Sequence, residues 1–278
     1  MADRTAGDRP PAGPQARYGP ADTGHTGDQN AQGAPGGPGG RPAYYAARPG
    51  GWRDWWTLLH PPYTAWHLSY VVIGAALAPQ VHLNRLLYTL AAFFLAVGVA
   101  AHALDELHGR PLRTRIPRAA LAGAAAVSLA GAVGLGAYGI TQAGWILVPF
   151  MVAGPTLVIA YNAELFGGVV HNDLGFAAAW GAFPVLTGYA AQDGNLGPAA
   201  GVAAAAALAL SAAQRRLSTP ARSIRRRAAR IDGVITLADG TTAPLGPDQL
   251  LHPLEGALRA MSYGVMLLAA ALAIARFS

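Results

Sequence analysis

The sequence predicts an all-α integral membrane protein, a polytopic bundle of about seven (seven to nine) transmembrane helices. Three observations support this prediction. Of the 278 residues, 53% are hydrophobic and only 12% are charged, which is a membrane-protein composition. The apolar residues form runs long enough to cross a bilayer, and the charged residues are concentrated in the short segments between those runs.

The apolar runs define the predicted helices. A membrane-spanning helix needs about 20 mostly apolar residues. Alanine and glycine dominate several of the runs, so we expect those helices to pack closely through small residues. The runs that qualify cover roughly residues 63–79, 85–104, 119–139, 144–161, 174–191, 197–213 and 256–276.

The first 50 residues have a different composition. Residues 1–50 are rich in Gly, Pro, Ala, Gln and Asp and show no apolar periodicity. Such a segment cannot bury enough apolar surface to offset its ordering entropy, so we expect a disordered tail without a signal peptide. Residues 51–278 then form the transmembrane domain, which begins with Trp52, Trp55 and Trp56 in the interfacial layer that tryptophan favours.

The basic residues predict the orientation. All 20 are arginine, and they concentrate in the segments 105–118 and 214–255, whereas the loops near 80–85, 140–143 and 192–196 carry only Arg85. By the positive-inside rule, the N-terminus and the loops 105–118, 162–173 and 214–255 face the cytoplasm of a multi-pass protein in the cell membrane. The net charge of +6 reflects these loops, so we expect no nucleic-acid partner. The lack of cysteine excludes disulfides and thiolate metal sites.

The segment 214–255 predicts a small cytoplasmic insert. Pro220 is suited to the first turn of a short basic helix over 221–231, whose Arg225, Arg226 and Arg227 would contact anionic lipid. Two short strands are expected around Asp239-Gly240, a dipeptide that favours a tight turn.

Ionisable residues occur where two predicted helices end at the cytoplasmic side. In "AAHALDELHGRPLRTRIP", His102, Asp105 and Glu106 share one helix face, because they are three and four residues apart. The next cytoplasmic loop, "YNAELFGGVVHNDLGF", supplies Tyr161, Asn162, Glu164, His171, Asn172 and Asp173. If the two loops adjoin, their side chains converge on one cavity, and ionisable groups at membrane depth are functional by default. A structural role, such as an ion pair of Asp105 with Arg110 or Arg113, remains the alternative for any single residue.

Two further interpretations concern single residue types. Arginine binds phosphate through paired N–H groups, so a diphosphate or a phospholipid headgroup is a candidate ligand. His67, within the first predicted span, is expected to be a hydrogen-bonded core histidine rather than a ligand. The arginines suited to phosphate are Arg110, Arg215, Arg216 and Arg222.

This layout resembles the UbiA superfamily of intramembrane prenyltransferases. Asp105, then Arg110-Pro111 and "LRTRIP" fall where that family has its aspartate-rich motif and basic stretch, and "YNAELFGGVVHNDLGFAAAWGAFPVLTGY" is similar to its fourth and fifth helices. The resemblance covers about residues 58–276. Of the family pattern N-D-x-x-D-x-x-x-D only Asp105 is present, since the other positions read Ala101, His102 and Gly109, and the second motif falls in "SAAQRRLSTPAR", which contains no acid.

The resemblance implies an enzyme that transfers a prenyl group from an isoprenoid diphosphate, or that acts on another lipid, with Mg²⁺ bridging protein and diphosphate. Three alternatives follow from the missing aspartates. In the first, other acids complete the metal site, and the histidines favour another divalent metal over Mg²⁺. In the second, the arginines bind phosphate directly. In the third, the chain binds lipid, metal or a protein partner without catalysis. The implied roles are catalysis by Asp105, Glu106 and His102, substrate binding by Arg110, Arg215, Arg216, Arg222, Tyr161 and Asn162, and metal binding by Asp105, Glu106, Glu164, His171 and Asp173.

Overall fold

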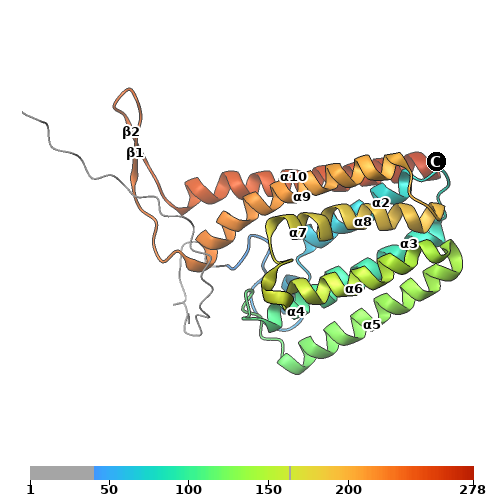
Figure 1. Cartoon of the computed structure of the whole chain (residues 1–278). Helices are drawn as coiled ribbons and strands as arrows, with labels where there is room; N and C mark the ends of the chain where they lie inside the picture. The colour runs from blue at the N-terminus through green and yellow to red at the C-terminus, as the bar shows by residue number, and fades with distance from the viewer. Residues whose placement is uncertain (1–40, 163) are drawn as a thin grey trace, which may run out of the picture. The chain divides into compact units, whose positions relative to one another are not determined.

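Helices contain most of the residues that the computed structural model describes, which are 41–162 and 164–278. These residues belong to the unit Ala34–Ser278, to which the following description refers. Figure 1 shows long helices running alongside one another. The helices are α1 (Trp52–Leu58), α2 (Pro61–Ala76), α3 (Leu83–Phe93), η1 (Phe94–Ala101), α4 (His102–Leu107), α5 (Arg118–Ala143), η2 (Trp145–Leu147), α6 (Val148–Asn162), η3 (Leu165–Gly168), α7 (Asp173–Ala177), η4 (Ala178–Ala182), α8 (Phe183–Asp193), α9 (Pro198–Arg227) and α10 (Pro247–Phe277).

The prediction of an all-α protein with membrane-spanning helices is confirmed at this level. Each predicted apolar run falls on a helical segment. Among the described residues, 5 helical segments are long and apolar enough to cross a membrane: Leu83–Leu107, Arg118–Ala143, Trp145–Asn162, Asp173–Asp193 and Pro247–Phe277. The predicted spans 63–79 and 197–213 fall on α2 and α9, which are not among these 5 segments. The helix α2 has only 16 residues, fewer than the roughly 20 that a perpendicular span needs, and the second half of α9 is rich in arginine.

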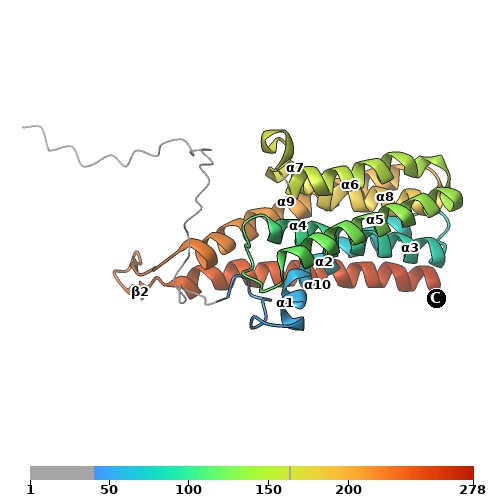
Figure 2. The same ribbon diagram turned by 90° about the horizontal axis from the view of Figure 1, so that it is seen from below.

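The helix α2 lies between α8 and α10, and α9 runs beside α10 (Figures 1 and 2). Two glycines bring α2 and α8 into backbone contact. A Cβ atom on Gly74 would lie 2.1 Å from the carbonyl oxygen of Val185, and one on Gly188 would lie 2.3 Å from that of Val71. Because no side chain fits at either position, glycine is required for this close crossing.

His67 is a hydrogen-bonded core histidine, as predicted. It is buried in α2, and its Nδ1 atom donates to the carbonyl oxygen of Trp180 over 2.8 Å. Trp66 and Tyr70 on the same helix are among the largest fully buried side chains, and they pack against Val185 of α8 and Val265 of α10. The interior therefore centres on α2.

The insert after α9 differs in part from the prediction. The hairpin is confirmed: β1 (Val234–Thr236) pairs antiparallel with β2 (Thr242–Pro244), and Gly240 has a φ of 84° in the turn. The separate basic helix over 221–231 is wrong, because α9 continues through Pro220 to Arg227. Buried residues at helical spacing keep one face of α9 packed on both sides of the proline, and this packing outweighs the local cost of the proline. These residues are Ser211, Gln214, Ser218 and Ala221.

Residues 41–50, which the composition assigns to the disordered tail, pack on the bundle and are called the N-terminal strap here. Ala43 and Ala46 are buried. The backbone N–H of Ala47 donates to Thr57 Oγ1 over 3.0 Å, so α1 anchors the strap. The rest of the predicted tail, residues 1–40, lies outside the described residues.

Candidate functional site

The two polar loops predicted to converge lie side by side and line one cavity of about 170 Å³, called the polar cavity here. Its walls come from the N-terminal strap, α2, the η1–α4 segment, the end of α6, α7 with η4, α9 and the start of α10. Polar and aromatic side chains face one another across it. The polar ones include His60, His67, His102, Asp105, Asn162, His171, Gln214, Arg215, Arg222, Arg225, Arg226 and Glu255, and the aromatic ones are Tyr44, Tyr45, Tyr63, Tyr161, Phe176 and Trp180.

The structure brings together some of the predicted site residues and separates others. The predicted residues that line the polar cavity are His102, Asp105, Tyr161, Asn162, His171, Arg215 and Arg222. Those that do not line it are Glu106, Arg110, Glu164, Asp173 and Arg216.

Glu106 holds the loop after α4 rather than facing the cavity. Its side chain is fully buried. One carboxylate oxygen accepts from the backbone N–H of Leu112 over 2.9 Å, and the other accepts from the N–H and the hydroxyl of Thr114, each over 2.8 Å. Arg110 serves the same loop, because its Nη1 atom donates to the carbonyl oxygen of Thr114 over 2.8 Å. Neither side chain is therefore directed at a ligand in the polar cavity.

The predicted metal ligands are not assembled. Asp173 is 68% exposed and accepts from Arg215 Nε over 3.0 Å, and Glu164 lies before η3 with a left-handed φ of 49°. Within 41–162 and 164–278, no three His, Asp or Glu side chains are arranged to hold one metal ion. Asp105, Glu106, Glu164, His171 and Asp173 thus do not form a common ligand set in this conformation.

Four histidines that line the polar cavity share one hydrogen-bonding pattern. Each Nδ1 atom bonds a backbone carbonyl, which only accepts, so Nδ1 carries the proton. In the neutral ring Nε2 then has a free lone pair. The rings of His60 and His102 stack with centroids 4.1 Å apart. The Nδ1 bonds run from His60 to Leu58 (2.8 Å), His67 to Trp180 (2.8 Å), His102 to Gly98 (3.0 Å) and His171 to Tyr161 (2.9 Å).

Arg222 is the central positive charge of the cavity. Burial lowers its pKa, and the charges of Arg215 and Arg226 lower it further. Among the described residues, its guanidinium forms neither a hydrogen bond nor an ion pair, whereas Arg215 bonds Asp173 and Arg226 donates from Nε to the carbonyl oxygen of Pro42 over 3.4 Å. The cavity therefore offers an unsatisfied, partly desolvated guanidinium with two more arginines close by.

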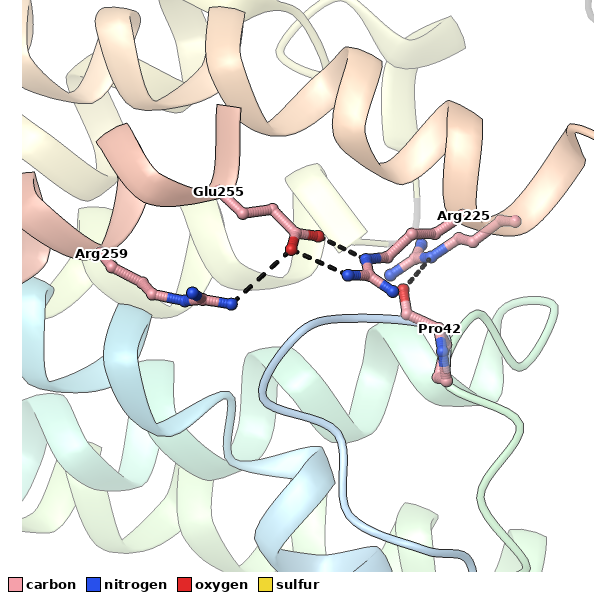
Figure 3. Close-up of polar contacts among 5 residues, drawn as sticks. Pro42, Arg225, Glu255 and Arg259 are labelled. Carbon is pink, nitrogen blue, oxygen red and sulfur yellow. Dashed lines mark hydrogen bonds and ion pairs between the residues drawn. The ribbon is translucent and has the colours of Figure 1, made fainter. Parts of the chain in front are cut away.

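Glu255 neutralises the other arginines of this region (Figure 3). Both carboxylate oxygens accept from Arg225, one of them from its Nη2 atom over 2.8 Å, and Arg259 lies 3.7 Å away on the opposite side. The guanidinium of Arg259 also lies over the ring of Tyr44, 4.8 Å from its centroid, which fixes the N-terminal strap against α10. Since Arg215 is paired with Asp173, the excess positive charge of the cavity resides on Arg222 and Arg226.

Three buried polar atoms in the cavity wall have no hydrogen-bond partner among the described residues. They are the hydroxyls of Tyr44 and Tyr161 and Oε1 of Gln214. A buried polar atom without a partner costs about 1–3 kcal/mol. These atoms therefore favour a polar ligand group at this place.

Five residues of the cavity wall were not predicted from the sequence: the strap tyrosines Tyr44 and Tyr45, together with His60, Tyr63 and Glu255. The pair Tyr44-Tyr45 was the available signal, since two adjacent aromatic rings are unusual in a segment of Gly, Pro and Ala.

Comparison of the chain with models of known families, with curated proteins and with solved structures finds no match in any of the three.

Proposed function

We propose that the protein is a UbiA-like integral membrane enzyme of the prenyltransferase type, which binds an isoprenoid diphosphate or a similar anionic lipid in the polar cavity on the cytoplasmic side of the cell membrane. The single observation that carries the proposal is Arg222, a partly buried guanidinium without a hydrogen-bonding partner in the described residues, with Arg215 and Arg226 nearby. One guanidinium group can donate two parallel hydrogen bonds to two phosphate oxygens, and a diphosphate has several such oxygens.

The rest of the wall suits the organic part of such a ligand. Phe176 and Trp180 line the cavity beside Tyr161, and their ring centroids lie 6.2 Å and 5.5 Å from that of Tyr161. Aromatic faces stabilise positive charge through their quadrupole. In a prenyl transfer the allylic C–O bond breaks and diphosphate leaves with the electron pair, so these rings would surround the allylic cation that forms.

The acceptor must lose a proton as its new bond to the allylic carbon forms. His102 is suited to take this proton at Nε2, because its Nδ1 atom is already bonded to the Gly98 carbonyl. Asp105, one helical turn further on, lines the same cavity, and its negative charge would stabilise the resulting imidazolium.

The residues do not fit a carboxylate-bridged pair of Mg²⁺ ions. Asp105 lines the cavity, but Glu255 is bonded to Arg225, and Glu106, Glu164 and Asp173 lie elsewhere. We therefore assign phosphate recognition to the arginines and route no step through a metal ion. A non-catalytic protein that binds lipid, metal or a protein partner is the second candidate, favoured by this same scarcity of acids in the cavity.

The test is calorimetric binding of geranylgeranyl diphosphate to the full-length protein in detergent, with and without Mg²⁺. Arg222→Gln should weaken binding at least tenfold, which corresponds to about 1.4 kcal/mol. Arg216→Gln is the matched control, because Arg216 is exposed on the same helix outside the cavity and should bind as the wild type does. Equal affinity in the two variants, or no binding by the wild type, would overturn the proposal.

Catalysis is tested separately from binding. With an acceptor that the wild type prenylates, His102→Gln should retain diphosphate binding and lose product. Binding without turnover by the wild type across a panel of phenolic and lipid acceptors would support the non-catalytic candidate instead.

A further inference from the structure

A second cavity, of about 110 Å³, lies between other helices of the bundle and is called the apolar cavity here. It is bounded by α3, η1, α5, α6, η4 and α8, and Phe93, Ala96, Leu157 and Phe183 are typical of its walls. The arginine among its lining residues, Arg85, donates from Nη1 to the carbonyl oxygen of Gln192 over 2.9 Å, so its guanidinium already has a hydrogen-bond partner in the protein. The apolar cavity therefore suits a hydrocarbon ligand.

Val97 and Trp180 line both cavities. They are both carried by π-helical segments, Val97 by η1 and Trp180 by η4. A π-helical segment changes the direction of its side chains relative to the flanking α-helix, and such segments are frequent at functional sites. The backbone of Trp180 is held in place from α2 by the hydrogen bond of His67, and its ring lies against Tyr161 on the polar side. Val97 and Trp180 thus form the partition between the two cavities.

We propose that the two cavities bind one molecule, with its anionic head at Arg222 and its hydrocarbon chain reaching the apolar cavity past Val97 and Trp180, and that this partition selects the length of the chain. This inference rests on the proposed function.

The character of the shared wall supports this assignment. A cavity of about 150 Å³ holds a single benzene-sized group, so the polar cavity of about 170 Å³ accommodates a head group and little more, and the apolar cavity of about 110 Å³ takes only a short part of a chain. A longer chain needs further apolar volume, and the wall that the polar cavity shares with the apolar one is itself apolar, formed by Val97 and the indole of Trp180. Removing the indole would join the two cavities, whereas a larger side chain at position 97 would narrow the passage.

The experiment compares dissociation constants of geranyl, farnesyl and geranylgeranyl diphosphate for the full-length protein in detergent. In Trp180→Ala, each added isoprene unit should increase affinity at least threefold more than it does in the wild type. In Val97→Phe, geranylgeranyl diphosphate should bind at least tenfold more weakly, while geranyl diphosphate binds as before. Trp145→Ala is the control, since Trp145 is 82% exposed and lines neither cavity.

The outcomes separate this inference from the proposed function. If the wild type binds the diphosphates and both partition variants, shown to be folded by circular dichroism, keep its dependence on chain length, the partition has no selective role and the inference is overturned. If the wild type binds none of the three compounds, the proposed function fails and the inference fails with it. Should Trp180→Ala not fold, Val97→Phe alone decides, because it retains the indole and its contacts.

Discussion

Asp105 and Glu106 are adjacent acids whose surroundings give them different tasks. Asp105 lines the polar cavity, whereas the carboxylate of Glu106 is buried and accepts three hydrogen bonds from Leu112 and Thr114. The sequence places both on the predicted cytoplasmic end of one helix, but helical spacing alone does not reveal which acid the following loop folds onto. That distinction depends on the path of residues 108–117, which a local pattern does not determine.

Glu106→Ala should therefore reduce stability and spare the site. The variant leaves buried backbone N–H groups of the loop without a partner, at about 1–3 kcal/mol for each. We expect a clear fall in thermal unfolding temperature in detergent, measured by circular dichroism. Asp105→Asn is the matched change at the neighbouring position and should keep the unfolding temperature while altering turnover. The reverse pattern would show that Glu106 belongs to the site and Asp105 to the scaffold.

His60 predicts a pH dependence of stability. Burial lowers its pKa well below the ordinary 6.5, and the charges of His102, Arg226 and Arg222 lower it further. Between the folded and the unfolded pKa, the unfolded chain binds a proton that the folded chain does not, so the free energy of unfolding rises with pH in this window. Stability contributed by the neutral ring is thus complete above about pH 6.5 and is lost as the pH falls below it, by up to about 1.4 kcal/mol per pH unit.

The comparison for this prediction is His60→Asn. Asparagine tolerates the left-handed φ of 46° at this position and retains an N–H donor for the Leu58 carbonyl. Unfolding temperatures between pH 7 and pH 5 should fall less steeply for the variant than for the wild type. Parallel curves would mean that His60 does not contribute to the pH dependence.

At the scale of elements, the apolar runs predicted where helices lie but not how far polar segments extend them. Pro220 suggested a helix start, yet Ser218 and Ala221 continue the buried face of α9 across it. The N-terminal strap was missed for the same reason: its stability comes from contacts outside the strap itself, with Thr57 and Tyr63 and with the distant Arg259. Contacts of this kind are tertiary, and local propensity does not encode them.

The strap is expected to be required for ligand binding. A chain that begins at residue 51 loses Pro42, Tyr44 and Tyr45 from the cavity wall. We expect its affinity for geranylgeranyl diphosphate to fall at least tenfold in calorimetry. A chain that begins at residue 41 retains the strap and serves as the control. If the shorter chain binds as well as the longer one, the strap is not part of the site.

The hairpin, in contrast, should be dispensable for the fold of the bundle. Val234, Ile235 and Leu237 are exposed, and the strands bond each other. The N–H of Leu245 donates to the carbonyl of Gly233 over 2.9 Å, so the two ends of the hairpin are close enough for a short glycine-serine linker to join them. Replacing 234–244 in this way should leave the unfolding temperature within about 2 °C, as is usual for changes at exposed positions. A larger fall would reveal a structural role for the hairpin.

At the scale of the whole molecule, the sequence predicted the class of the protein better than its site. Composition is summed over many residues, so a membrane bundle follows from it, and arginine placement adds a prediction of its orientation. The polar cavity draws its residues from the strap, α2, α4, α6, α7, α9 and α10. Of these, the sequence predicted only that the loop with His102 and Asp105 meets the loop with Tyr161 and His171, because the polar residues of both loops interrupt apolar runs.

The predicted orientation is testable because the chain has no cysteine, so a single introduced thiol is unique. Ala238→Cys in the exposed turn of the hairpin should react with a membrane-impermeant maleimide in inverted vesicles and not in intact cells. Asn195→Cys, exposed in the loop between α8 and α9, should show the opposite behaviour. Labelling of both positions from the same side would contradict the orientation.

The close approach of Gly74 to Val185 and of Gly188 to Val71 has a mechanical consequence. At these two positions backbone lies against backbone with no side chain that can yield between them, so we expect α2 and α8 to move together. His67 of α2 also bonds the carbonyl oxygen of Trp180 in η4, which leads directly into α8. Any widening that admits a ligand must therefore come from elements outside this pair of helices, and the strap is the element whose contacts are side-chain contacts that can break and re-form, from Ala47 to Thr57 and from Arg259 to Tyr44.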